Sequence, residues 1–252
     1  MVTVENLAPV VTVDTPPQDV QYSDRIADVT FTATDVSSID TMNAQTSYSI
    51  DGGEFFAGLP DALTIVGELS FNGPADQQTD ATWTLSGIAD LAPGSYIIRV
   101  TVTDDDGSSG SADATIDVTR EDAVPTYVGP LFVSTPSIDV TTAIVELRAV
   151  IQDVTLYPQN DDWDPHAGNV TGALVTFVNL DTDTVIAEDV PVQLIDPADP
   201  LTGVAIYAWA VDLGNADSAS ITVGYVVEGF YTCAEEETVI TVSKPLQDFI
   251  TG

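Results

Sequence analysis

The sequence predicts an all-β protein made of two tandem Greek-key β-sandwich domains. Short runs in which apolar and polar residues alternate recur along the whole chain, and such alternation is typical of half-buried strands. Gly, Pro and Asp separate the runs and favour turns. Val and Thr recur within the runs, and both residues favour strands. The length of 252 residues is sufficient for two domains of ordinary size.

The first half of the chain contains six such runs, at residues 10–13, 29–33, 48–50, 82–85, 96–102 and 112–118. In the second run, Val29, Phe31 and Ala33 fall on one face of the expected strand. The third run ends at Asp51-Gly52-Gly53, which is a hairpin signal. Six or seven short strands with turns between them predict a Greek-key sandwich.

The second half repeats this organisation with different spacing. Its expected strands are residues 144–151, 173–178, 184–187, 204–211, 219–227 and 239–242. The turn at residues 181–183 predicts that 184–187 pairs with 173–178. We place the boundary at the Pro-containing joint of residues 120–125, which gives a first module at 1–122 and a second module, with a C-terminal linker, at 123–252.

Tyr96 follows the turn at Pro93-Gly94 and begins a late strand. This arrangement resembles the tyrosine corner of Ig-type sandwiches, in which a buried tyrosine ring packs and its hydroxyl bonds back to the chain. The sequence is therefore expected to form two tandem Ig-like Greek-key β-sandwich domains.

Residues 96–118, with their Val-Thr-Val-Thr-Asp-Asp-Asp-Gly core, resemble the closing hairpin of bacterial and archaeal Ig-like repeats. Repeats of the polycystic-kidney-disease (PKD) type and their relatives are the nearest match. Residues 48–53 stand where PKD repeats carry a Trp-Asp-Phe-Gly-Asp-Gly signature, and they read Tyr-Ser-Ile-Asp-Gly-Gly. The second module, ending in residues 243–245 and 249–252, looks like modules late in very long secreted surface proteins. The resemblance implies an extracellular spacer, adhesion or polymer-contacting role without catalytic residues.

The charge balance excludes two classes of partner. Forty acidic residues face five basic ones, for a formal net charge of −35. Nucleic acid and anionic membrane surfaces would be repelled, because their binding depends on Lys and Arg. Two explanations of the acidity remain open: carboxylates that bind divalent cations such as Ca²⁺, or a halophilic setting in which salt screens the repulsion. The single lysine favours the saline setting.

Three strand-then-proline endings, near residues 2–9, 116–125 and 239–245, predict that the chain is a piece of a longer array. No run of apolar residues is long enough for a membrane span, and the N-terminus has no features of a signal peptide. An export signal is therefore expected upstream. Cys233 is the only cysteine, which rules out an intrachain disulfide.

Calcium binding is the sharpest chemical prediction, because Ca²⁺ takes six to eight oxygen ligands from carboxylates, amides and carbonyls. The first candidate ligand set is Asp153, Asn160, Asp161, Asp162 and Asp164. The alternative is that this loop is a solvated acidic turn.

The second calcium candidate is the turn at residues 104–107, with Asp104 and Asp106 as ligands. Asp-Gly is a hairpin signal in its own right, so a turn with surface charge is the alternative. Neither loop has the EF-hand pattern. Zinc and iron are not expected, since His166 and Cys233 are the only His and Cys.

No catalytic motif is present, and we expect no enzyme: the chain lacks a Gly-x-Ser-x-Gly elbow and a phosphate-binding glycine loop. The glutamates beside Cys233 are expected to raise the pKa of its thiol. Trp163 either stacks on a sugar ring or folds back over its loop, whereas Trp83 and Trp209 are expected in the core. Asn169 begins an Asn-x-Thr glycosylation sequon.

These observations predict a non-catalytic structural and adhesive module of an extracellular, cell-surface multi-domain protein, with calcium as a candidate stabiliser. The expected partners are neighbouring modules of the array, and surface glycans or other surface proteins. One alternative is a glycan-binding accessory module of a secreted polymer-degrading enzyme. Another is a surface-layer or filament subunit whose open edge strand pairs with the next copy.

Overall fold

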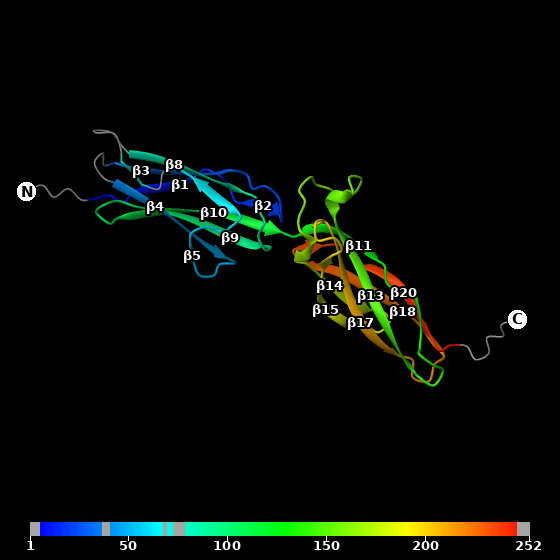
Figure 1. The fold of residues 1–252 in the computed structure, drawn as a ribbon. Helices are drawn as coiled ribbons and strands as arrows, with labels where there is room; N and C mark the ends of the chain where they lie inside the picture. The colour runs from blue at the N-terminus through cyan, green and yellow to red at the C-terminus, as the bar shows by residue number, and fades with distance from the viewer. Residues whose placement is uncertain (1–5, 37–40, 68–69, 73–78, 246–252) are drawn as a thin grey trace, which may run out of the picture. The chain divides into compact units, whose positions relative to one another are not determined.

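The computed structural model of the chain describes residues 6–36, 41–67, 70–72 and 79–245 (Figure 1). The strand ending expected at residues 2–6 lies almost wholly outside this part, as do residues 249–252. The described residues form β-strands and two short 3-10 turns, without α-helix, so the predicted all-β sandwich class is confirmed. None of these elements is a helix long and apolar enough to cross a membrane. The chain divides into two compact units, Met1–Thr119 and Arg120–Gly252.

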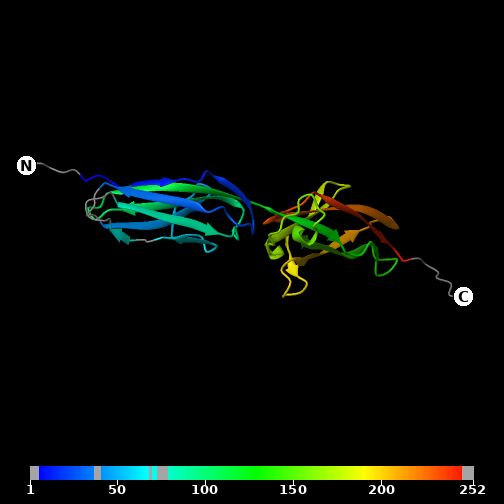
Figure 2. The ribbon, with the colours of Figure 1, turned by 90° about the horizontal axis from the view of Figure 1, so that it is seen from above.

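The first unit is a sandwich of two sheets (Figures 1 and 2). One sheet has the order β1-β3-β8-β6, and the other has the order β2-β10-β9-β4-β5, with β7 beside β4. The pairing is antiparallel except between β2 and β10, which run parallel. The strands are β1 (Val10–Val13), β2 (Gln18–Gln21), β3 (Val29–Asp35), β4 (Thr41–Ile50), β5 (Phe56–Ala57), β6 (Leu63–Val66), β7 (Ser70–Asn72), β8 (Thr79–Gly87), β9 (Gly94–Thr103) and β10 (Ser109–Thr119).

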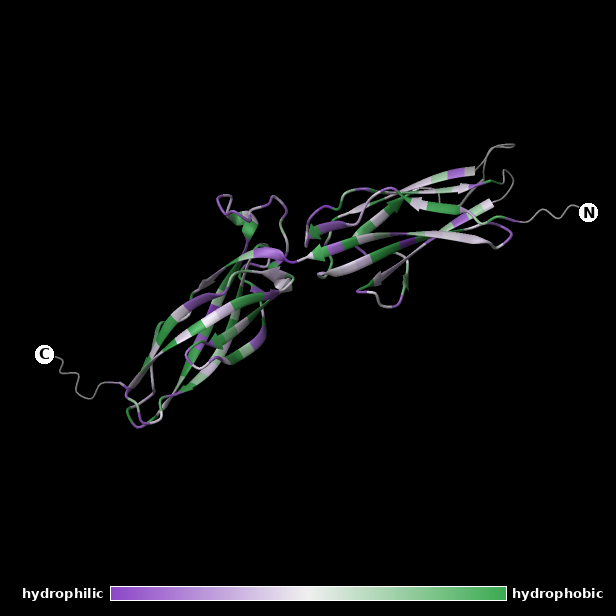
Figure 3. Cartoon of the chain, turned by 180° about the vertical axis from the view of Figure 1, so that it is seen from behind, coloured by the Kyte–Doolittle hydropathy of each residue, from purple (hydrophilic) through white to green (hydrophobic). Residues whose placement is uncertain are grey.

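Alternation along the strands builds the core of the first unit. Phe31 of β3 and Trp83 of β8 are fully buried and stand opposite each other in register, and Ile98 of β9 is fully buried in the other sheet. Apolar and polar residues alternate visibly along these strands (Figure 3). The Tyr96 hydroxyl donates a hydrogen bond to the Ala92 carbonyl at 2.9 Å, which confirms the tyrosine corner.

The second unit is also a sandwich of two sheets, ordered β16-β17-β13-β11-β19 and β12-β20-β18-β14-β15. Its strands are β11 (Glu121–Tyr127), β12 (Phe132–Ser134), β13 (Thr142–Asp153), β14 (Ala173–Asn179), β15 (Thr184–Pro191), β16 (Gln193–Leu194), β17 (Thr202–Asp212), β18 (Ser218–Gly229), β19 (Tyr231–Thr232) and β20 (Glu236–Ser243). The 3-10 turns are η1 (Val154–Leu156) and η2 (Val170–Gly172). Glu121 and Asp122, which the sequence analysis assigned to the first module, lie in β11 of this unit.

The two units have the same strand order. Strands β1, β3, β8 and β6 of the first unit correspond to β11, β13, β17 and β16 of the second, and the other sheets correspond in the same way. In each unit the first chain segment divides between the sheets. Strands β1 and β11 pair antiparallel with one sheet, whereas β2 and β12 pair parallel with the last strand of the other sheet. This division and the two-sheet order are those of an Ig-like sandwich.

Trp209 corrects one core prediction. It pairs with the fully buried Val145, so it stands on the inward face of β17, but the residue is only half-buried. Strand β16 covers the outer edge of β17 only opposite Gly203 and Val204. The alternation of apolar and polar residues in the sequence predicts correctly which face of β17 carries Trp209. How far a residue near a sheet edge is exposed depends on the tertiary structure.

Candidate functional site

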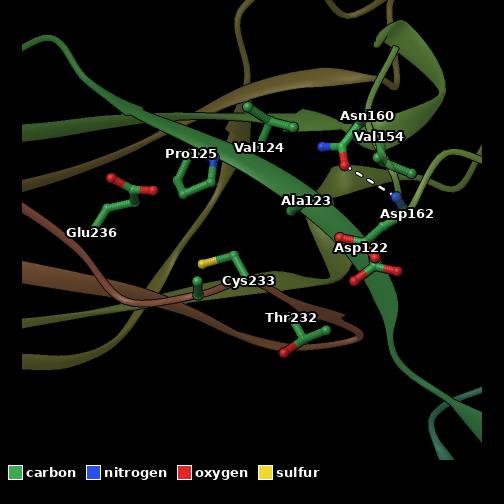
Figure 4. Close-up of a pocket in the computed structure, with 11 residues that line it drawn as sticks. Asp122, Ala123, Val124, Pro125, Val154, Asn160, Asp162, Thr232, Cys233 and Glu236 are labelled. Atoms are coloured by element: carbon green, nitrogen blue, oxygen red, sulfur yellow. Dashed lines mark hydrogen bonds between the residues drawn. The ribbon is translucent and has the colours of Figure 1, made fainter. Parts of the chain in front are cut away.

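The residues of the first calcium candidate belong to one end of the second unit. The first residues of β11, the β13–β14 connection at residues 154–172 and strand β19 meet there. A pocket of about 260 Å³ lies between these segments (Figure 4). Asp122 and Asp162 stand at one end of the pocket and Glu236 at the other, with Cys233 between them. Asn160 and Thr232 also line it.

Asp153 holds the β13–β14 connection in place. It is the last residue of β13 and is fully buried. Its Oδ1 accepts hydrogen bonds from the Thr155 amide at 3.0 Å and the Thr155 hydroxyl at 2.5 Å. Its Oδ2 accepts from the Gly168 amide at 2.9 Å and the Tyr231 hydroxyl at 2.8 Å. Four protein donors thus satisfy this carboxylate, and they tie both ends of the connection and β19 to β13.

The other residues of the first calcium candidate are more exposed to solvent than Asp153. Asn160, Asp161 and Asp162 are exposed, and Asp164 is half-buried. The Asn160 Oδ1 accepts from the Asp162 amide at 3.1 Å (Figure 4). Within the described ranges, no group of three or more His, Cys, Asp or Glu side chains is arranged to hold a metal ion. Calcium binding by this ligand set stays a prediction.

Glu121 is a site residue outside both predicted calcium ligand sets. It is the first residue of β11 and is fully buried. Burial chiefly raises its pKa, to about 9, and the neighbouring carboxyl groups of Asp164 and Asp153 raise it further. Its Oε1 accepts a hydrogen bond from the Asp122 amide at 2.9 Å. A lone glutamate in a Pro-containing joint shows no sequence pattern that would have marked it.

The second calcium candidate is a structured turn between β9 and β10. Asp104 is buried, and its Oδ1 accepts from the Ser108 amide at 2.8 Å. Its Oδ2 accepts from the Asn6 side chain at 2.8 Å. Asp106 is exposed. Asp104 therefore organises the turn through Oδ1 and ties it to the segment before β1 through Oδ2. Calcium binding by Asp104 and Asp106 stays a prediction.

The Cys233 thiol has a raised pKa, as the sequence predicts, but the main cause is different. Burial raises the pKa most, and the nearby Glu236 adds a smaller effect. The Val227 amide donates to Cys233 Sγ at 3.3 Å. A thiol that ionises only above its ordinary range is a poor nucleophile at neutral pH.

Trp163 folds back over its own loop, since its Nε1 donates to the Thr155 carbonyl at 3.1 Å. The side chain nevertheless remains 41% exposed. A recess of about 460 Å³ lies in the same loop, lined by Leu156, Tyr157 and Pro158 among others.

Three other predicted positions are placed as follows. Trp83 is in the core, and His166 is exposed. Asn169 of the sequon is exposed and caps η2, with its Oδ1 accepting from the Thr171 amide and hydroxyl.

No protein-family model matches the chain, and no curated protein matches it. Among solved structures, the adhesin InvE of Yersinia pseudotuberculosis is 15% identical, with a TM-score of 0.37 over 93% of this chain and 58% of the adhesin chain. A family 123 glycoside hydrolase from Clostridium perfringens is 10% identical, with a TM-score of 0.33 over 46% of this chain and 30% of the hydrolase chain. The chain thus spans less than two thirds of both proteins, and neither likeness bears on its function.

Proposed function

We propose that this chain is a non-catalytic structural and adhesive part of an extracellular, cell-surface multi-domain protein, related to PKD-type repeats. One observation carries the proposal: two sandwiches with the same strand order follow one another, and only Arg120 separates β10 from β11. Each unit has its own apolar core, so the core of each unit is complete without the other. The proposed partners are neighbouring modules of the array and surface glycans or proteins.

The chemistry of the described residues supports a role without catalysis. Asp153 at the second unit's pocket end is hydrogen-bonded to backbone and hydroxyl donors, and Asp161 and Asp162 are exposed. The Cys233 thiol has a raised pKa. An activated nucleophile needs a base within hydrogen-bond reach or a lowered pKa.

The net charge of −35 supports a saline extracellular setting. At an ionic strength of about 1 M the Debye length falls to roughly 3 Å, so carboxylates on the surface no longer repel one another over long distances. The same charge disfavours close association between copies at low salt.

A second candidate function, glycan binding, is favoured by Trp163. An indole that is 41% exposed, in the loop that also contains a recess lined by Leu156 and Pro158, offers an apolar surface to a sugar ring. Glycan-binding accessory modules of polymer-degrading enzymes need such a surface, whereas a spacer does not.

Binding of the 252-residue chain to immobilised polysaccharides, with parallel assays for released sugars, separates these functions. A structural and adhesive module releases no sugar, and any binding of surface glycans by it does not depend on Trp163. A glycan-binding module binds, loses binding in Trp163→Ala and keeps it in the control Phe132→Ala, in which an 80% exposed aromatic residue elsewhere in the same unit is removed. Release of sugars by the parent chain would contradict both.

The filament alternative is tested by sedimentation velocity in molar NaCl. The structural module is expected to remain a monomer over a wide range of concentrations. A filament or surface-layer subunit would form open assemblies that grow with concentration, because pairing at a strand edge does not close on itself.

A further inference from the structure

Two buried carboxylate oxygens in the second unit have no hydrogen-bond donor. They are Oε2 of Glu121, at the start of β11, and Oδ2 of Asp164, in the β13–β14 connection. The Glu121 side chain is fully buried, and its carboxyl group interacts directly with that of Asp164. The two residues lie 43 positions apart in sequence, so their interaction is not a feature of a local turn.

Each carboxylate is oriented through its other oxygen. The Asp122 amide donates to Glu121 Oε1 at 2.9 Å, and the His166 amide donates to Asp164 Oδ1 at 2.6 Å. Backbone groups therefore fix both carboxylates through one oxygen each, and the other oxygen of each is buried without a hydrogen-bond donor. Asp153, which also acts electrostatically on Glu121, adds a third carboxylate to the neighbourhood.

Buried carboxylates that lie close together require a compensating positive charge, because they are near each other and no water screens their repulsion. Four of the five basic residues, Arg25, Arg99, Arg148 and Lys244, form ion pairs with other acids, Asp28, Asp113, Glu146 and Asp217. The charged groups that act on Glu121 are the carboxyl groups of Asp164 and Asp153. The compensating charge is then either a shared proton or a bound cation. The free atoms are oxygens only, which are the ligands that Ca²⁺ and Mg²⁺ prefer.

We propose that Glu121 Oε2 and Asp164 Oδ2 together bind a divalent cation of the Ca²⁺/Mg²⁺ class. The ion ties the first strand of the second unit to the β13–β14 connection, in addition to the hydrogen bonds of Asp153. This ligand pair differs from the one predicted from sequence, since Glu121 replaces the exposed Asp161 and Asp162, and Asp153 supplies charge and no free oxygen.

The test uses the whole chain at pH 8 in molar NaCl, after treatment with a chelator. Calorimetric melting is recorded with CaCl₂ and, separately, with MgCl₂, for the parent, Glu121→Gln, Asp164→Asn and the control Asp161→Asn. At about 100 times the dissociation constant, the midpoint of the second unit is expected to rise by roughly 10 °C in the parent. The control should show the same rise, and both site variants should lose it. The salt that raises the melting midpoint more identifies the ion.

Two further measurements distinguish a variant that has lost the ion site from one that has lost its folded structure. Without divalent ions, Glu121→Gln should melt no lower than the parent, because a pKa of about 9 leaves Glu121 mostly protonated at pH 8, and the neutral amide imitates that form. Tb³⁺ luminescence excited through tryptophan should appear in the parent and Asp161→Asn, since Trp163 adjoins Asp164, and should disappear in Glu121→Gln. The proposal is overturned if neither salt moves the parent's midpoint, which would assign a shared proton to the pair. A rise that persists in both site variants would overturn it equally.

Discussion

Replacing Tyr231 by Phe tests whether Asp153 holds the β13–β14 connection. The substitution removes only the hydroxyl that donates to Asp153 Oδ2 at 2.8 Å. The ring is fully buried and keeps its packing, and Oδ2 keeps the Gly168 amide as a donor. A hydrogen bond to a charged group contributes about 1.5–3 kcal/mol. We therefore expect Tyr231→Phe to lower the free energy of unfolding of the second unit by about 2 kcal/mol.

The measurement is urea unfolding followed by circular dichroism, in molar NaCl. The midpoint should fall while the m-value stays constant, because the surface exposed on unfolding hardly changes. The matched control is Tyr207→Phe, where the residue is 38% exposed and the expected change is within about 0.5 kcal/mol. Equal stability of Tyr231→Phe and the parent would refute the assigned role of Asp153. Limited proteolysis should also cleave residues 154–168 faster in Tyr231→Phe.

Three other predictions concern separate parts of the chain. The Gly110→Ala variant should lose about 1–3 kcal/mol of stability in urea unfolding, because a Cβ at Gly110 would lie 2.0 Å from the Pro9 carbonyl oxygen. Unchanged stability would mean that the segment before β1 can move to make room for the methyl group. Alkylation of Cys233 in the folded chain should reach half of its maximal rate at a pH above 9.0, since burial raises the thiol pKa from that value; the unfolded chain should show the ordinary midpoint. For the same reason, the thiol's contribution to stability is present below the unfolded pKa and is lost as pH rises through the folded pKa. Melting midpoints should rise between 0.01 M and 1 M NaCl, as the Debye length falls from about 30 Å to about 3 Å; a constant midpoint would show that the −35 charge is already compensated.

The strands that could be predicted from sequence are those with one face exposed to solvent and the other buried in the core. Val29, Phe31 and Ala33 alternate because β3 lies between two neighbouring strands over a core. The turn after β4 was also predictable, since Asp51 and Gly52 both have positive φ angles, of 51° and 72°, as Asp-Gly turns require.

The missed strands lack that signal for physical reasons. Strand β11 contains Pro125, and proline lowers the expectation of a strand. It is tolerated because β19 pairs only with Glu121 and Asp122, which leaves the β11 edge at Pro125 without a strand partner in the described residues. Strand β2 (Gln18–Gln21) is short and mostly polar, and it is held by its parallel pairing with β10.

The candidate site was only partly predictable. Composition drew attention to the acidic loop, but the number of carboxylates in a sequence does not tell which of them are buried. Asp153 and Asp161 belong to the same predicted ligand set, yet one is fully buried and the other exposed. Glu121 meets Asp164 only because β11 packs beside the connection that follows β13, a contact between distant segments that no local pattern encodes.

The parallel pairs that close each sandwich determine how a unit responds to traction along the chain. A pull on both ends of the first unit first loads β1, which pairs antiparallel with β3, and then the start of β2 and the end of β10. Because β2 and β10 are parallel and in register over Gln18–Gln21 and residues 116–119, the force runs along them and shears all their hydrogen bonds at once. An antiparallel hairpin pulled from its open end would instead unzip one bond at a time. Strands β12 and β20 repeat this geometry in the second unit. Each unit thus contains a pair of parallel strands whose hydrogen bonds such traction loads in shear.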